Sequence, residues 1–439
     1  MLRSLFFISF LIINHISFSQ SSTTSFHFKD SLTRSQTMDS LKLVRLQQLK
    51  TKAKLNFEYY KNSDSKENIT ILNLSYLDLT EIPDFVYEYN NLKRLELKYN
   101  NIEKLPGKLR RLDSLKYLDI SFNELSGHRI KAKKNKNVKK IYLEGNNLKQ
   151  VPKWIKKFKN LEDLDITKNE LTDIPSLLRK NKKLFRLDVS YNPLKFTNTD
   201  FTALKNVQFL KITSCKIDSV PEEISKMTQL IDLNFTQNNI KSIPTSISNL
   251  QNLEKLSFYD NKIEKIPEEL FDLENLVELD LYFNNLSQVS DKIAKMDHLE
   301  TLFLSNNQLY TLPETLGTMN NLKKLYIHHN RMSYLPNSIT NLKNLEVLHI
   351  QNNDFPDFPN VIFSLINLTD LDISYTPISI IPVDIRKLDK LNLLFFQGIK
   401  LDLENPENDH LKETIQDFRK NGTIVRYNTL GKSFDIGDK

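Results

Sequence analysis

Residues 92–106 read LKRLELKYNNIEKLP, and residues 299–313 read LETLFLSNNQLYTLP. Both stretches follow the template L-x-x-L-x-L-x-x-N-x-L-x-x-L-P, and eight further residues complete a unit of 23. Fifteen units follow one another without insertion or deletion, beginning at residues 69, 92, 115, 138, 161, 184, 207, 230, 253, 276, 299, 322, 345, 368 and 391. We call them coils 1 to 15 and number the positions in each coil from 1 to 23. A fixed period of this length predicts a solenoid, in which each repeat packs on its neighbours.

Each coil is expected to contribute one short strand and one tighter turn. Apolar residues at positions 4 and 6 predict a strand over positions 3–5, with these side chains pointing inward. Some return segments begin with Pro-Glu-Glu, at Pro221 and Pro267, and these residue types favour the first turn of a helix. We therefore predict an α/β solenoid, a horseshoe of about 15 coils. Its concave side would be a parallel β-sheet, and its convex side would carry short helical or 3-10 turns.

Position 9 is nearly always asparagine. A buried amide at this position can donate to and accept from backbone groups of its own coil and the adjoining coils. The one cysteine of the chain shares the position, so we assign it a structural role rather than that of a nucleophile. The expected ladder consists of Asn100, Asn123, Asn146, Asn169, Asn192, Cys215, Asn238, Asn261, Asn284, Asn307, Asn330, Asn353 and Thr376.

The N-terminal residues predict export. Arg3, the apolar residues 5–13 and the small residues Ser17 and Ser19 are typical of a secretory signal peptide over residues 1–19. The apolar run is too short to span a bilayer, and no other stretch is long and apolar enough. The Ser/Thr-rich residues 20–36 are expected to be disordered.

Both ends of the array, residues 69–401, are expected to be capped because an open solenoid exposes its core. Residues 37–68 would form a helical N-terminal cap, with an apolar face made of Leu43, Leu46, Leu49, Ala53 and Phe57. Residues 402–439 would form a C-terminal cap and tail. This cap would consist of a helix from Pro406, burying Leu411, Ile415 and Phe418, and a strand over residues 423–427.

The amino-acid composition gives little information about the kind of partner that the protein binds. The net charge of +7 is small for 439 residues and does not by itself indicate nucleic-acid binding. The Lys-rich segment 129–140 could bind an acidic partner or an anionic lipid surface, or it could be a solvated part of the convex face. No motif for catalysis or for a cofactor occurs, so we expect neither enzymatic activity nor a cofactor.

The candidate ligand site comes from position 5, at the centre of the concave face. This column is mostly acidic from Glu96 to Asp188 and aromatic from Phe303 to His349. Exposed aromatic residues on successive strands are typical of a binding hot spot, although they could also stabilise neighbouring strands by stacking. The candidate ligand-binding residues are Tyr282, Phe283, Phe303, Tyr326, His328, His329 and His349.

Two other groups of residues on the concave face are expected to form neither a metal site nor a catalytic site. The three histidines of the candidate site lack a carboxylate or thiol at the spacing of a metal site, so we predict no metal. Acid pairs such as Asp163 and Asp165 are expected to be ordinary surface charges without an enclosing cleft.

The template resembles that of leucine-rich-repeat proteins of the typical 23-residue class, notably bacterial secreted members and intracellular Ras-suppressor-like scaffolds. The resemblance covers residues 69–398. It implies protein recognition on the concave sheet or its rim but names no ligand. Internalins fit less well because they use a 22-residue period and a following immunoglobulin-like domain. Bacterial ubiquitin-ligase effectors also fit less well, because they carry a catalytic domain with its own cysteine.

We therefore expect an exported, non-catalytic protein-interaction module in the secreted fraction or cell envelope. It would bind a protein ligand on the concave face of the leucine-rich-repeat horseshoe. One alternative is an intracellular signalling scaffold, which requires that residues 1–19 are not a working signal. Another alternative is a glycan- or cell-wall-binding protein that uses the same aromatic residues.

Overall fold

The computed structural model describes residues 27–125, 137–197, 199–401, 406–429 and 432–433. The chain divides into two compact units between Tyr59 and Tyr60, and each unit is described by itself. The predicted signal peptide and most of the Lys-rich segment lie outside the described residues.

Helix α1, His27–Asn62, is longer than expected. It begins inside the segment 20–36 that we expected to be disordered. Residues 27–62 contain neither proline nor glycine, and Ser and Thr lower helix propensity only slightly. The leucines of the expected apolar face are exposed: the exposed fraction is 56% for Leu43, 38% for Leu46 and 39% for Leu49.

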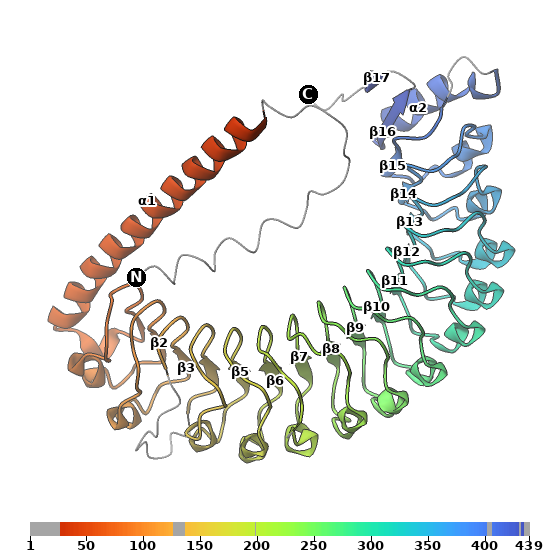
Figure 1. Ribbon diagram of the computed structural model, residues 1–439. Helices are drawn as coiled ribbons and strands as arrows, with labels where there is room; N and C mark the ends of the chain where they lie inside the picture. Colours follow the sequence, from red (N-terminus) through yellow and green to blue (C-terminus); the bar gives the residue numbers. More distant parts are fainter. Residues whose placement is uncertain (1–26, 126–136, 198, 402–405, 430–431, 434–439) are drawn as a thin grey trace. The chain divides into compact units, whose positions relative to one another are not determined.

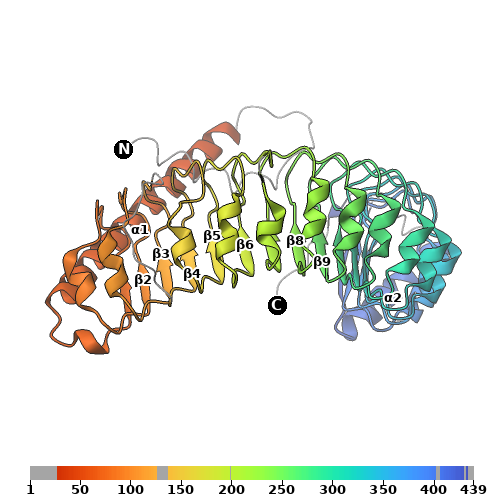
Figure 2. The same cartoon turned by 90° about the horizontal axis from the view of Figure 1, so that it is seen from below.

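The second unit contains an open parallel sheet, to which every coil contributes one strand on the inner side of the arc (Figures 1 and 2). Equivalent residues of successive coils are paired, so that Leu95 aligns with Leu118. The predictions of a solenoid horseshoe and of strands at positions 3–5 are confirmed. The strands are β1 Ile71–Asn73, β2 Arg94–Glu96, β3 Tyr117–Asp119, β4 Lys140–Tyr142, β5 Asp163–Asp165, β6 Arg186–Asp188, β7 Phe209–Lys211, β8 Asp232–Asn234, β9 Lys255–Ser257, β10 Glu278–Asp280, β11 Thr301–Phe303, β12 Lys324–Tyr326, β13 Val347–His349, β14 Asp370–Asp372 and β15 Leu393–Phe396.

Single 3-10 turns form the outer side of the arc (Figure 1). A proline precedes most of them in extended conformation, as Pro221 does with φ −65°. At η6 and η10 the preceding residue is Asp200 or Ser290 instead, and its side chain accepts a hydrogen bond from a backbone N–H of the first turn. The turns are η1 Lys66–Asn68, η2 Asp84–Glu88, η3 Gly107–Arg111, η4 Ile155–Lys157, η5 Ser176–Lys180, η6 Phe201–Leu204, η7 Glu222–Lys226, η8 Thr245–Asn249, η9 Glu268–Asp272, η10 Asp291–Lys295, η11 Glu314–Thr318, η12 Asn337–Asn341, η13 Asn360–Ser364 and η14 Val383–Lys387.

The core lies between the sheet and these turns. Leu95 and Leu97, at positions 4 and 6 of coil 2, have no exposed surface, and the same holds for Ile224 and Met227 in the return segment of coil 7. Burial of such side chains contributes about 1.5–3 kcal/mol each, and most coils repeat the set among the described residues. The array is therefore held together by contacts between nearest neighbours.

The position-9 asparagines connect each coil to the one before it. Asn123 donates from Nδ2 to the carbonyl of Leu97 in the preceding coil (2.9 Å) and to that of Ile120 in its own coil (3.2 Å). Its Oδ1 accepts from the backbone N–H of Ile102, also in the preceding coil, at 2.9 Å. Asparagines from Asn100 to Asn353 repeat this pattern and are all buried.

Cys215 occupies this position with a reduced set of bonds. Its Sγ lies 3.5 Å from the carbonyl of Val189 and 3.4 Å from that of Thr213. In other coils the asparagine Oδ1 accepts a bond from the N–H at position 11 of the preceding coil, but the thiol offers no equivalent oxygen. The corresponding N–H, that of Leu194, donates to the carbonyl of Asn192 instead. Burial raises the pKa of the Cys215 thiol to about 12, which disfavours the reactive thiolate.

A second row of asparagines, which the sequence analysis missed, follows position 23 on the surface. Asn252 donates to the carbonyl of Thr228 at 2.8 Å, and Asn275 donates to that of Gln251 at 2.8 Å. Asn321, Asn344 and Asn367 make the same contact with the preceding coil. These amides are exposed, so each contributes less than a buried ladder amide.

A helix and two strands follow the array. A 3-10 turn, η15 Pro406–Asn408, precedes helix α2, Leu411–Lys420, so the helix begins later than Pro406. Leu411, Ile415 and Phe418 are buried. Strand β16, Ile424–Thr429, pairs in parallel with β15, and β17, Lys432–Ser433, pairs antiparallel with β16.

Candidate functional site

Most acidic side chains at position 5 bind the backbone of their own coil. In the sheet, the N–H groups of positions 6 and 8 donate to the next coil, as Leu97 does to Asp119 at 2.8 Å. The N–H of position 7 donates instead to the side chain two residues earlier. The carboxylates that accept this bond, at 2.9–3.1 Å, are Asp119, Asp165, Asp188, Asp280 and Asp372. Much of the acidic column therefore satisfies backbone groups and is not free for a ligand.

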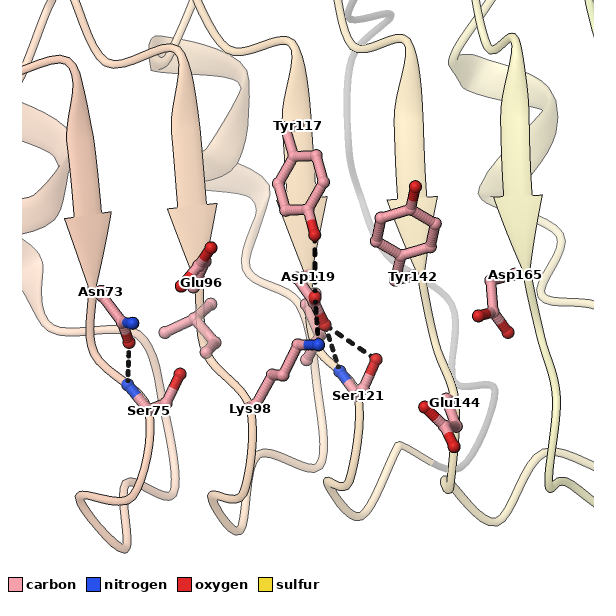
Figure 3. A network of polar contacts seen from close by, with 12 residues as sticks. Asn73, Ser75, Glu96, Lys98, Tyr117, Asp119, Ser121, Tyr142, Glu144 and Asp165 are labelled. Carbon is pink, nitrogen blue, oxygen red and sulfur yellow. Dashed lines mark hydrogen bonds and ion pairs between the residues drawn. The ribbon is translucent and has the colours of Figure 1, made fainter. Parts of the chain in front are cut away.

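Asp119 is the extreme case, with no exposed surface. Its Oδ1 accepts from the N–H of Ser121 at 3.1 Å and from the Ser121 hydroxyl at 2.7 Å. Its Oδ2 accepts from the Tyr117 hydroxyl at 3.1 Å and lies 3.0 Å from Lys98 Nζ. Figure 3 shows these four contacts converging on one carboxylate between neighbouring strands. The expectation that position 5 faces solvent is therefore wrong for Asp119.

Asp163 and Asp165 are not the ordinary surface charges that we expected. Asp163 is only 7% exposed, and it accepts a hydrogen bond from the Tyr142 hydroxyl at 3.1 Å. Asp165 accepts from the backbone and the hydroxyl of Thr167, at 2.9 and 2.8 Å. Burial nevertheless raises the pKa of Asp165 to about 6, because desolvation disfavours its charged form. The expectation failed because neighbouring side chains on a concave sheet cover one another.

A shallow hollow of about 280 Å³ lies on coils 4–7 beside these residues. Two of its charges are paired with each other: Glu144 Oε1 lies 2.7 Å from Lys168 Nζ. The hollow is lined by Glu144, Asp165, Thr167, Lys168, Asp188, Ser190, Tyr191, Lys211 and Thr213. The polar groups of this half of the concave face thus largely find partners in neighbouring coils.

A row of aromatic rings at position 8 of coils 1–3, which the sequence analysis did not select, follows the edge of the concave face. The rings of Tyr76 and Tyr99 are stacked with centroids 4.6 Å apart, and those of Tyr99 and Phe122 are stacked at 4.4 Å. The Phe122 ring then lies over Gly145, where a Cβ atom would come within 2.6 Å of it. Because the ring faces cover one another, this row stabilises adjacent coils. Its signal in the sequence is the repetition of aromatic residues at one position.

The predicted ligand-binding residues lie together on coils 10–13. Phe303 and Tyr326 are stacked with centroids 4.7 Å apart, and His349 meets Tyr326 edge-on at 5.0 Å. Tyr282 meets His328 at 5.5 Å across coil 11. Tyr259, which the sequence analysis did not select, stacks on Tyr282 at 5.2 Å. We call the following residues the aromatic patch: Tyr259, Tyr282, Phe283, Phe303, Tyr326, His328, His329 and His349.

Two histidines of the aromatic patch are neutral at pH 7. Burial lowers the pKa of His328 to about 3, with smaller contributions from His329 and His349. Burial also lowers the pKa of His329. The Nδ1 atoms of His328 and His329 are 2.8 Å apart. Within the part of the chain that the structure describes, no group of three or more His, Cys, Asp or Glu residues is placed to hold a metal.

Unpartnered polar atoms distinguish the aromatic patch from the other half of the concave face. Among the described residues, eight buried side-chain polar atoms have no hydrogen bond. Four of the eight lie on the concave face of coils 11–14: Ser305 Oγ, His349 Nε2, Gln351 Oε1 and Asp370 Oδ1. His349 Nε2 lies 3.2 Å from Asp370 Oδ1, an ion-pair distance, but the two atoms are poorly aligned for a hydrogen bond. Each unsatisfied buried group costs about 1–3 kcal/mol, and a ligand that supplied partners would recover this cost.

Comparisons with known proteins identify the repeat. A family model described as a leucine-rich repeat region matches residues 197–292. A second model, described as a leucine rich repeat, matches residues 67–125, 136–194 and 298–355. Together the two models cover more than half of the chain. No curated protein matches it.

Solved structures share the fold. A Leptospira interrogans leucine-rich-repeat protein is 27% identical, with a TM-score of 0.72, over 84% of this chain and 97% of that protein. The functional domain of InlJ from Listeria monocytogenes is 21% identical, with a TM-score of 0.60, over 77% and 69% of the two chains. The plant peptide hormone receptor RGFR1, in complex with RGF2, is 25% identical, with a TM-score of 0.53, over 76% and 60%.

A helix that crosses a bilayer has to be both long and apolar. None of the helices within the described ranges combines the length and the apolar character needed to cross a bilayer.

Proposed function

Because this chain belongs to the leucine-rich-repeat family, whose members are typically non-catalytic protein-interaction modules, we propose that it is an exported protein that binds a protein ligand on its concave face. The aromatic patch would be the contact surface. The observation that carries this proposal is the clustering of unpartnered buried polar atoms on coils 11–14, among stacked aromatic rings. Aromatic side chains with polar atoms between them are typical of interface hot spots.

The arrangement of the rings favours a protein ligand over a glycan. Sugars bind to the open faces of aromatic rings, whereas the faces of Phe303 and Tyr326 cover each other. A peptide can contact the ring edges, and it can supply hydrogen bonds to the buried Ser305 Oγ and Gln351 Oε1 once neighbouring side chains move apart. The structure of RGFR1 in complex with RGF2 shows that a related array accommodates such a ligand, which supports the proposal.

Replacing Phe303 and Tyr326 together with alanine is expected to weaken ligand capture by roughly 30-fold or more, because hot-spot residues contribute about 2 kcal/mol or more. The measurement compares the proteins that immobilised wild type and variant retain from culture medium or host extract. The control carries alanine at Phe185 and Phe209, a second aromatic pair on the concave face with centroids 6.2 Å apart.

A protein retained by wild type and by the control, but not by the patch variant, supports the site. Equal retention by all three proteins would show that the aromatic patch is not the contact surface. Binding of the wild type to purified cell-wall polymer from which proteins have been removed would favour the glycan alternative.

Export is tested by the mature N-terminus. Mass spectrometry is expected to find a chain that starts near Gln20 outside the cytosol, because a peptidase cleaves after the small residue Ser19. The variant Ser19→Leu is expected to retain the signal, since a large side chain does not fit that peptidase site. An intact Met1 in the cytosolic fraction of wild-type cells would contradict export and support the intracellular scaffold.

A further inference from the structure

Acidic residues without a Lys or Arg partner among the described residues lie on coils 13 and 14. The concave positions of these two coils carry no Lys or Arg, and their acids are Glu346, Asp354, Asp370 and Asp372. Among the described residues, none of the four forms an ion pair with Lys or Arg, whereas Lys323 on coil 12 is paired with Glu300 at 2.9 Å. Other cations, Lys324 and Arg331 on coil 12 and Lys400 and Arg426 beyond coil 14, flank these acids without forming an ion pair with them among the described residues. The end of the aromatic patch is therefore locally acidic.

Asp370 and Asp372 keep acceptor capacity beside aromatic rings. Asp370 Oδ1 is buried 3.2 Å from His349 Nε2 without a hydrogen bond, and Asp372 uses one oxygen to accept from the N–H of Ser374 at 2.9 Å. His349 and Phe395 occupy position 5 on either side of Asp372. The guanidinium of Arg426 already lies 5.3 Å from the centroid of the Phe395 ring. A further cationic side chain would thus find both a carboxylate and neighbouring rings.

Ser305 marks the other end of this surface. It has no exposed surface, and its Oγ has no partner. The rings of Tyr282 and His328, on the coils to either side, meet at 5.5 Å.

Serines at the same position of other coils differ from Ser305 in having partners. The Ser121 hydroxyl donates to Asp119 at 2.7 Å, and Ser190 Oγ accepts from the N–H of Thr213 at 2.9 Å. Ser374 Oγ likewise accepts from the N–H of Gln397 at 3.0 Å. The buried unpartnered hydroxyl of Ser305 is therefore not shared by Ser121, Ser190 or Ser374.

We propose that the ligand presents a basic, extended peptide segment to coils 11–14. An Arg or Lys side chain of this segment binds Asp370 and Asp372, and a polar group at its other end bonds Ser305 Oγ once the Tyr282 and His328 rings move apart. Three coil spacings of about 4.8 Å separate the two anchors, a distance that about four residues of extended chain span. Neutral His328 and His329 do not repel the cation. This inference rests on the proposed function and specifies its ligand.

The test uses a phage-displayed library of random linear peptides, selected on the full mature chain. We expect enriched peptides to contain Arg or Lys. Their affinity should fall roughly 10-fold or more with Asp370→Asn, because a charge-assisted hydrogen bond is lost. The matched control is Asp232→Asn, which changes the same position on coil 8 and should leave affinity unchanged.

Serine variants provide a second comparison. Ser305→Ala should reduce affinity for the enriched peptides without lowering the unfolding temperature, because its hydroxyl has no partner to lose. Ser190→Ala should do the opposite, since its Oγ accepts a backbone hydrogen bond. A loss of stability with Ser305→Ala equal to that of Ser190→Ala would contradict the assigned role of Ser305.

The outcomes separate the inference from the proposed function. Peptides that require Phe303 and Tyr326 but lack basic residues and ignore Asp370→Asn would overturn the inference and leave the proposed function in place. If no enriched peptide depends on Phe303 and Tyr326, both are overturned. Basic peptides that bind Asp370→Asn as well as wild type would show that the cation is bound elsewhere.

Discussion

Asn238→Ala is expected to lower the free energy of unfolding by about 3–5 kcal/mol, because it leaves several buried backbone groups unsatisfied. Asn238 Nδ2 donates to the carbonyls of Ile212 and Phe235, at 2.8 and 2.9 Å. Its Oδ1 accepts from the N–H groups of Cys215 and Ile217, at 2.9 and 3.3 Å. Alanine can replace none of these contacts.

The measurement is urea-induced unfolding followed by circular dichroism. Asn252→Ala is the matched control, because this exposed asparagine makes one bond to the preceding coil, and its loss should change stability by less than about 0.5 kcal/mol. Comparable losses for the two variants would mean that the buried ladder does not hold the coils together.

Asp119→Ala is expected to lower the free energy of unfolding by about 3 kcal/mol, since the buried N–H and hydroxyl of Ser121 lose their acceptor. The Tyr117 hydroxyl loses its contact as well. Lys98 contributes less, because its ammonium group can turn to solvent.

Asp119→Asn should cost less than Asp119→Ala, about 1–2 kcal/mol, because the amide oxygen still accepts from Ser121 while the charge is lost. Asp218→Ala, which removes an exposed carboxylate, serves as the control and should be nearly neutral. If Asp119→Ala unfolds like the wild type, the carboxylate is not the structural acceptor inferred from its contacts.

The strands and turns of the array could be predicted because one residue pattern repeats in register. Each prediction for one coil, such as an inward Leu95, was supported by the same residue type in many others. The boundaries of α1 were less accessible, because a single helix offers no such repetition. Ser and Thr in residues 27–36 suggested disorder, but the absence of proline and glycine allowed the helix to continue.

The sequence placed the candidate site on the aromatic half of the concave face, but it could not show which polar side chains there or on the acidic half already have partners. An aspartate at position 5 has the same residue type whether it faces a ligand or accepts the N–H of position 7. Only the geometry showed that Asp119 is enclosed and that Ser305 lies without a partner. The outer row of asparagines could have been predicted from the sequence, because Asn252, Asn275 and Asn321 recur every 23 residues or a multiple of 23.

The ladder also has a direction. Asn123 satisfies Leu97 and Ile102 of the coil before it, and each later asparagine does the same for its predecessor. A nascent chain emerges from its N-terminus, so a coil cannot complete its hydrogen bonds until the asparagine of the next coil has been synthesised. The last coil of the growing array therefore always has backbone groups without their hydrogen-bond partners. The most recently synthesised position-9 asparagine determines how many coils can have a complete set of these bonds.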